Sequence, residues 1–104
     1  MSISTPHAVS LIVALAAFAS TAAQAGQDAQ TRQLSASCSA CHGTDGRSVG
    51  GTPMLTGLDR AHFVKQMKDF KSGARPATVM HRHAAGYTDL EIEKMADYFS
   101  ALKR

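Results

Sequence analysis

The five residues Cys38-Ser39-Ala40-Cys41-His42 decide how this sequence is interpreted. They contain both cysteines of the 104-residue chain, separated by two residues, and a histidine follows the second cysteine directly. This spacing is typical of c-type haem attachment, because it lets both thiols reach the two vinyl groups of one porphyrin and places the imidazole beneath the iron. We therefore predict one covalently bound haem c, attached through Cys38 and Cys41, with His42 as the first axial ligand.

Other uses of the two cysteines fit the sequence less well. A redox dithiol or a disulfide is compatible with C-x-x-C in an oxidising compartment. A thioredoxin-like site, however, would need a preceding strand within a longer βαβ unit. A bridge between such close neighbours would also close too short a loop to stabilise a small domain. Zinc would need a second ligand pair, and His62, His81 and His83 do not have the spacing of a zinc finger.

The N-terminus has the features of an export signal. Ala8 to Ala19 form an uncharged apolar run of the length of a signal h-region, although Lys and Arg are missing before it. Ala23-Gln24-Ala25 then supplies small residues at the two positions that a signal peptidase recognises. We expect a signal peptide at residues 1–25, a monohaem domain at residues 26–104 and a periplasmic location. After signal removal we expect no membrane span.

The charge of the chain excludes some classes of partner. The formal net charge is only +3, and two ionised haem propionates would reduce it further. Nucleic acid is therefore not expected as a partner, whereas a local basic patch can still steer an acidic protein surface.

Helical signals dominate the sequence after residue 27, which predicts an all-α fold with three main helices and Gly-rich loops around the haem. The first helix is expected from about Asp28 to Ala40. Five of the eight glycines lie between residues 43 and 57, which predicts a loop. Asp59 should cap a second helix that ends at Gly73, and residues 74–87 should form a second loop. Thr88 and Glu91 form a capping-box pattern before the last helix.

Seven residues are candidates for the sixth position on the iron. Met67 and Met95 lie in apolar helical stripes, where methionine usually packs in the core. Met80 follows Pro76 in the second predicted loop, where a flexible segment can place a thioether opposite His42. Met80 is therefore the favoured ligand, and imidazole from His83 or His81 stays an alternative. Met54 and His62 complete the set of candidates.

The sequence resembles the class I c-type cytochromes, and among them the cytochrome subunits of flavocytochrome c sulfide dehydrogenases. The resemblance rests on the attachment motif, on Thr52-Pro53-Met54-Leu55-Thr56-Gly57-Leu58 and on Lys68-Asp69-Phe70-Lys71-Ser72-Gly73 through Arg75-Pro76 to Met80. Further matches are Ala85-Gly86-Tyr87-Thr88-Asp89 and Glu93-Lys94-Met95-Ala96.

This resemblance implies roles for several residues. The carbonyl of Pro53 would accept a hydrogen bond from the ring of His42, and Leu55 would cover the haem. Leu34 and Tyr98 would lie where the first and last helices cross. In the family the methionine at the place of Met80 is the distal ligand.

The function expected from these features is electron transfer without catalysis and without a small-molecule substrate. The resemblance implies a sulfide-oxidising flavoprotein, or another redox protein, as the partner. A free soluble monohaem carrier is the alternative. A haem-based sensor would need an open iron, and a peroxidase would need a distal acid–base group such as His81 or His83.

Overall fold

The computed structural model describes residues 29–104, so the predicted signal peptide and its cleavage point lie outside the described residues. Residues 29–36 are helical, and four helices and one 3-10 turn follow them. The bounds are α2 Ser39–His42, η1 Thr44–Gly46, α3 Arg60–Ser72, α4 Met80–Ala85 and α5 Asp89–Ala101. Residues 29–104 contain no β-strand, which confirms the predicted all-α fold.

Helix α3 begins and ends where the sequence predicted, and α5 begins at its predicted capping box. The carboxylate of Asp59 accepts a hydrogen bond from the backbone N–H of His62 at 2.9 Å, and α3 ends at Gly73 in the left-handed conformation. At the start of α5, Thr88 and Glu91 form both hydrogen bonds of the capping box.

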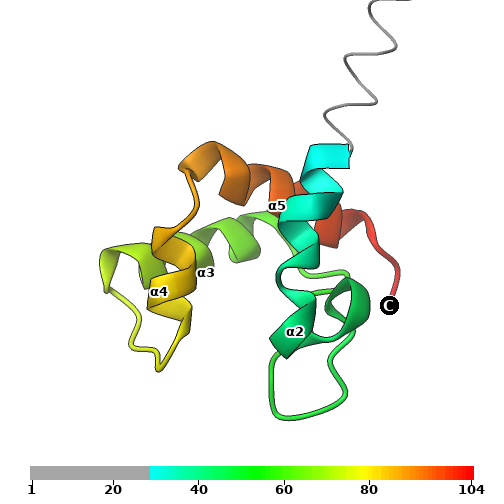
Figure 1. The fold of residues 1–104 in the computed structure, drawn as a ribbon, viewed down its shortest axis with the longest axis horizontal. Coiled ribbons are helices and arrows are strands. Elements are labelled where there is room, and N and C mark those ends of the chain that lie inside the picture. Colours follow the sequence, from blue (N-terminus) through cyan, green and yellow to red (C-terminus); the bar gives the residue numbers. More distant parts are fainter. Residues whose placement is uncertain (1–28) are drawn as a thin grey trace, which may run out of the picture. The chain divides into compact units, whose positions relative to one another are not determined.

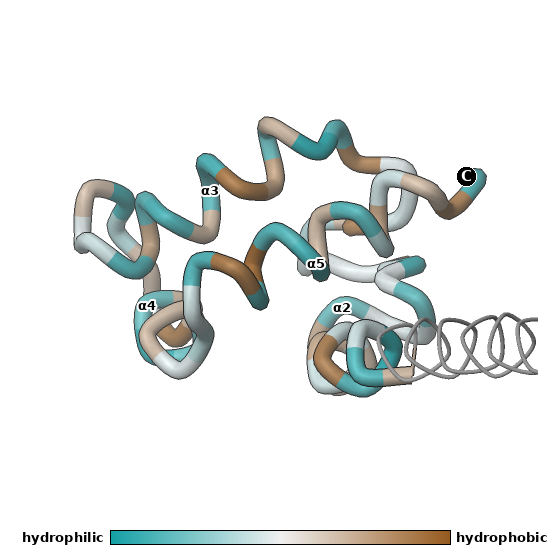
Figure 2. The backbone as a smooth tube through the Cα atoms, turned by 90° about the horizontal axis from the view of Figure 1, so that it is seen from above, coloured by the Kyte–Doolittle hydropathy of each residue, from teal (hydrophilic) through white to brown (hydrophobic). Residues whose placement is uncertain are grey.

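The hydrophobic core lies between α3 and α5, which carry hydrophobic stretches and pack together (Figure 2). Phe63 of α3 lies with its ring centre 5.6 Å from that of Phe99, whose side chain is fully buried. Helix α4 packs against α3 through Ala84, which is also fully buried. The other buried hydrophobic residues are Met67, Ile92, Met95 and Ala96. Residues 31–104 thus form one compact unit.

The first helix was predicted to be continuous from Asp28 to Ala40. This prediction is wrong, because the structure interrupts the helix at Ser37 and Cys38. The hydroxyl of Ser37 donates a hydrogen bond to the carbonyl of Leu34 at 2.7 Å, and the N–H of Cys38 bonds to the carbonyl of Ser35. Serine side chains compete in this way with the regular helical pattern. Helix α2 then begins a new turn that carries the second cysteine and the histidine.

The second predicted loop is also partly wrong, because residues 80–85 within it form α4. This helix has no side-chain cap at Val79, and six residues are too few for a helix that is stable alone. Its stability therefore comes from packing on α3, which local sequence signals do not reveal.

Candidate functional site

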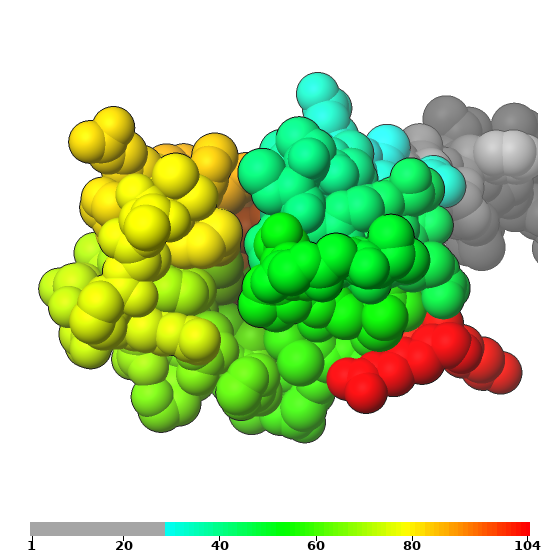
Figure 3. All heavy atoms as spheres, turned by 90° about the horizontal axis from the view of Figure 1, so that it is seen from below, coloured from blue at the N-terminus to red at the C-terminus, as the bar shows by residue number. Residues whose placement is uncertain are grey.

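A crevice separates two parts of the molecule. In Figures 1 and 2, α2 and α4 lie apart from each other, both on the same side of α3 and α5. The space-filling view shows the surface hollowed between the segment that includes α4 and the segment that includes α2, with atoms of α5 visible inside (Figure 3). The attachment motif and Met80 thus belong to elements on opposite walls of this crevice.

Both cysteines of the attachment motif lie on one helical turn. Cys38 is the N-cap of α2 and is half-buried, whereas Cys41 is exposed. Residues three apart on a helix lie on the same face, so both sulfur atoms are available to one ligand. Burial raises the pKa of the Cys38 thiol, the Ser37 side chain acts in the opposite direction, and the nearby Cys41 adds to the rise.

His42 is the best-defined side chain of the motif. It is only 8% exposed, and its ring Nδ1 lies 2.7 Å from the carbonyl oxygen of Pro53. Because a carbonyl only accepts, Nδ1 must carry the ring proton, which leaves the Nε2 lone pair free to bind a metal. The hydrogen bond that the family resemblance implied is therefore present.

The loop that carries Pro53 is held by contacts from several directions. The hydroxyl of Thr56, which is fully buried, donates to the carbonyl of Asp45 at 2.6 Å. The N–H of Leu55 donates to the carbonyl of Gly46 at 2.8 Å. From the C-terminal end of the chain, Arg104 donates to the carbonyl of Thr56 at 3.2 Å. These bonds fix the backbone next to Pro53 and so the orientation of the His42 ring.

The residues of this motif fit haem c by the chemistry of their donor atoms. Two thiols stand one helical turn apart, and the adjacent imidazole offers Nε2 while its other nitrogen is held by a carbonyl. Such a carbonyl partner is usual for metal-ligating histidines, because it fixes the tautomer and raises the basicity of the ring.

The structure also distinguishes among the candidates for the sixth ligand. Met80 is the first residue of α4 and packs partly buried against the core. Met67 and Met95 are buried in the core, as predicted from their apolar stripes, whereas Met54 is 42% exposed. His62 is exposed at the first turn of α3.

The two histidines beside Met80 differ in their surroundings. The ring of His83 is exposed. His81 is half-buried, and its Nδ1 atom is buried without a hydrogen-bond partner. Of the two histidines, His81 is thus the less exposed, although the sequence favoured His83 as the alternative ligand.

Several residues that shape the site were not singled out from the sequence. They are Ser37, Asp45, Thr56 and Arg104, and the hydrogen bonds that join Ser37 to Tyr87, Asp45 to Tyr98 and Thr56 to Arg104 each span at least 48 residues. No local pattern marks such residues, since their partners become neighbours only after folding.

Two features are absent from the part of the chain that the structure describes. Among residues 29–104, no group of three or more His, Cys, Asp or Glu side chains is arranged to hold a metal ion. Within the same range, no helix has the length and the apolar character needed to cross a membrane.

Comparison with known proteins places the chain in a family. The sequence model of the cytochrome c family matches residues 23–103. The chain is 46% identical over 71 residues to the cytochrome subunit of sulfide dehydrogenase from Chlorobaculum tepidum. The matched region covers 68% of this chain and 64% of that protein. It is 38% identical over 68 residues to the thiosulfate dehydrogenase electron acceptor of Stutzerimonas stutzeri, covering 64% of this chain and 32% of the relative.

A third relative is nearer in length. The chain is 33% identical over 72 residues to cytochrome c-553 of Helicobacter pylori, covering 67% of this chain and 75% of that protein. By contrast, the chain spans less than two thirds of the Chlorobaculum tepidum protein and about a third of the Stutzerimonas stutzeri protein. Because the family match extends over most of the sequence, the chain belongs to the cytochrome c family, and this membership implies one covalently bound haem c.

Proposed function

We propose that this chain is an electron-transfer cytochrome in which Cys38 and Cys41 hold the haem as thioethers and His42 is an axial ligand. The observation that carries the proposal is the 2.7 Å hydrogen bond from His42 Nδ1 to the Pro53 carbonyl. It directs Nε2 to the metal and stabilises the ring in one orientation. Held by the Pro53 carbonyl, the His42 imidazole would keep its position when the charge of a bound haem iron changes, which would favour rapid electron transfer.

Met80 is the proposed second axial ligand. It begins the element that lies across the crevice from α2, and it is partly buried against the core. A thioether sulfur raises the reduction potential of the iron relative to a second imidazole. The role of the other residues is to exclude water from this crevice and to hold the two ligands in place.

The partner that we propose is the flavoprotein subunit of a sulfide dehydrogenase, with the chain exported to the periplasm as its signal-like N-terminus suggests. The similarity to a protein named cytochrome subunit of sulfide dehydrogenase supports this choice. Purification from the native source tests it. Co-elution with a flavin-containing subunit is the expected result, and recovery of a free haem protein would favour the soluble carrier instead.

Haem attachment is tested by intact mass. The expected mass is that of the processed chain plus one haem, with colour that acid and organic solvent do not extract. Changing Cys38 or Cys41 to serine should remove one thioether bond. A mass equal to the bare polypeptide would exclude the proposed attachment.

The axial ligands are tested by spectroscopy of three variants. With Met80 on the iron, the ferric protein should show the weak long-wavelength charge-transfer band of a sulfur ligand. Met80→Ala should abolish this band and lower the reduction potential. His81→Ala and His83→Ala should preserve the band at neutral pH. If the wild type lacks the band and a histidine variant alone opens the iron to carbon monoxide, the ligands are two histidines.

A further inference from the structure

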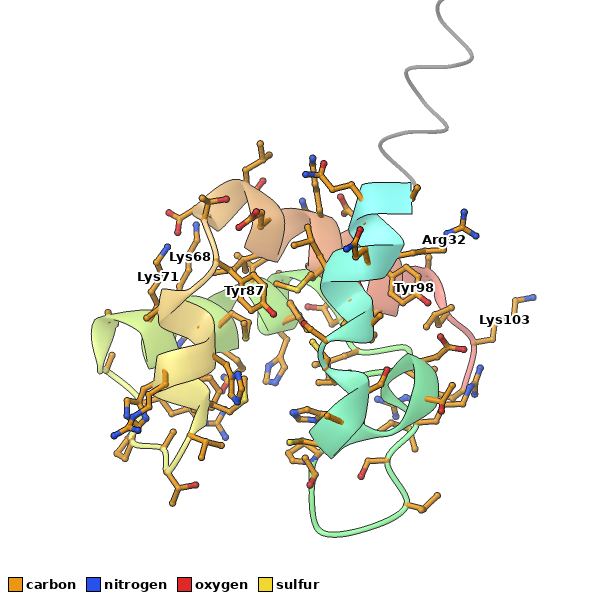
Figure 4. All side chains as sticks on the ribbon, in the orientation of Figure 1. Arg32, Lys68, Lys71, Tyr87, Tyr98 and Lys103 are labelled. Atoms are coloured by element: carbon orange, nitrogen blue, oxygen red, sulfur yellow. The ribbon has the colours of Figure 1, made fainter. Side chains whose placement is uncertain are left out.

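One hydrogen bond joins the two walls of the crevice directly. The hydroxyl oxygen of Ser37 lies 2.6 Å from the phenol oxygen of Tyr87, fifty residues later in the chain. Ser37 precedes Cys38 on one wall, and Tyr87 comes after α4, which begins at Met80, on the other. Figure 4 shows the Tyr87 ring between α4 and the helical residues that precede α2.

The direction of this hydrogen bond is set by the other bond that Ser37 makes. The Ser37 hydroxyl donates its hydrogen to the carbonyl oxygen of Leu34 at 2.7 Å. A hydroxyl has one hydrogen and two lone pairs, so Ser37 must accept from Tyr87. The phenol of Tyr87 is therefore the donor, and phenylalanine at this position would remove the bond while keeping the ring.

Tyr87 is itself fixed by contacts on its own side of the crevice. The ammonium group of Lys71, at the end of α3, donates to the Tyr87 carbonyl at 2.7 Å and to the Asp89 carboxylate at 3.2 Å. The N–H of Tyr87 bonds to the carbonyl of Ala84 in α4 at 3.2 Å. The residue that reaches across the crevice is thus anchored to α3, α4 and the start of α5.

The chain before Met80 contacts α3 through Arg75, whose N–H bonds to the carbonyl of Asp69 at 3.1 Å and whose guanidinium lies 4.9 Å from the centre of the Phe70 ring. Residues 71–76 are all exposed, as are Thr78 and Val79. Val79 provides no side-chain cap for α4. The start of α4 is therefore held by the partial burial of Met80 against the core, by the packing of Ala84 on α3 and by the bond of Tyr87 across the crevice.

We propose that Ser37 and Tyr87 form a clasp that keeps the Met80 wall closed against the wall that carries the attachment motif. This inference rests on the proposed ligation by Met80. The two residues are positioning residues that do not touch the iron. Their hydrogen bond disfavours the open state that an external ligand must populate before it replaces Met80.

The test measures imidazole binding to the ferric holoprotein at constant pH, followed by the change in haem absorbance during titration, with the long-wavelength band recorded separately. Tyr87→Phe and Ser37→Ala should each raise the imidazole affinity by about three- to tenfold, the range that one hydrogen bond supports. The double variant should bind no more tightly than the stronger single variant, because both changes remove the same bond.

Two control variants separate the clasp from general loss of stability. Ser100→Ala removes a hydroxyl that donates to the carbonyl three residues earlier, as Ser37 does, but this hydroxyl lies in α5 and not on the wall that faces Tyr87. Thr88 follows Tyr87 directly, and Thr88→Ala removes the capping box at the start of α5. Neither change should alter imidazole affinity, although Thr88→Ala should lower stability.

The ways in which the proposal can fail are distinguishable. If the band is present in the wild type but Tyr87→Phe leaves imidazole affinity unchanged, only the clasp is excluded. The clasp is also excluded if Thr88→Ala raises the affinity as much as Tyr87→Phe does. If the wild type lacks the band and binds imidazole as tightly as Met80→Ala, ligation by Met80 is excluded, and the clasp is excluded with it.

Discussion

The phenol of Tyr98, in α5, donates a hydrogen bond to the carboxylate of Asp45 at 2.9 Å. Asp45 has a φ of 53° within the turn η1, and its carbonyl accepts the hydroxyl of the buried Thr56. The bond from Tyr98 thus connects the last helix to the loop that leads to Pro53. Burial and the bond to Asp45 both raise the pKa of Tyr98 above its ordinary value of 10.0, while Arg32 acts in the opposite direction.

Tyr98→Phe should reveal this bond through the pH dependence of stability. The folded protein raises the pKa of Tyr98. The contribution of the Tyr98–Asp45 hydrogen bond to the free energy of unfolding is therefore complete below pH 10.0, and it is lost as the pH rises through the folded-state pKa. At neutral pH the variant should lose about 1 kcal/mol of unfolding free energy.

Denaturant unfolding of both proteins between neutral and alkaline pH provides the measurement. The stability difference between wild type and variant should shrink as the pH rises above 10.0. A difference that stays constant or grows over this range would contradict the role assigned to the Tyr98 proton.

Gly46 should tolerate no side chain. A Cβ atom at this position would lie 2.6 Å from Leu55 Cβ and 3.0 Å from the Phe99 ring, and the backbone φ of 73° is left-handed. Strain and overpacking together should make Gly46→Ala lower the unfolding free energy by about 2–4 kcal/mol. Gly50→Ala is the matched control, because no atom lies within 4 Å of its Cβ, and it should change stability by less than about 0.5 kcal/mol. Equal effects in denaturant unfolding would refute the packing described for η1.

Two methionines of opposite exposure provide a second matched pair. Met95 is fully buried and Met54 is 42% exposed. Met95→Ala should lower the unfolding free energy by about 2–5 kcal/mol through lost contacts and a cavity, and Met54→Ala by less than about 0.5 kcal/mol. Both variants should keep the long-wavelength band. Loss of the band in either variant would assign that methionine to the iron instead of Met80.

The lysines of α3 should influence association with an acidic redox partner. Lys65, Lys68 and Lys71 are exposed along this helix, although Lys68 and Lys71 both approach the carboxylate of Asp89. Lys68→Glu should slow association at low ionic strength and have little effect at high ionic strength, as expected for electrostatic steering.

Lys103→Glu changes the charge by the same amount far from α3, as Figure 4 shows, and serves as the control. Stopped-flow measurement of the association rate at several salt concentrations compares the two variants. Equal slowing would indicate an effect of net charge, and no slowing by Lys68→Glu would favour an apolar docking surface around Cys38 and Ala40.

The sequence by itself determined the elements whose signals are local. Asp59 and Gly73 predicted the ends of α3, and Thr88 with Glu91 predicted the start of α5, because these residues bond to backbone within one helical turn. The attachment motif is local in the same sense, since its chemistry needs only five consecutive residues. The assignment of its residues to the haem remains a prediction that the proposed experiments address.

Tertiary structure decided what depends on distant partners. Helix α4 forms where the sequence predicted a loop, because Ala84 is buried against α3 and packing outweighs the weak helical signals of a six-residue segment. The helix before Cys38 is interrupted where Ser37 bonds to Leu34 and meets Tyr87. A hydrogen bond between residues fifty positions apart exists only once the fold has brought both walls of the crevice together, so no pattern in the sequence could indicate it.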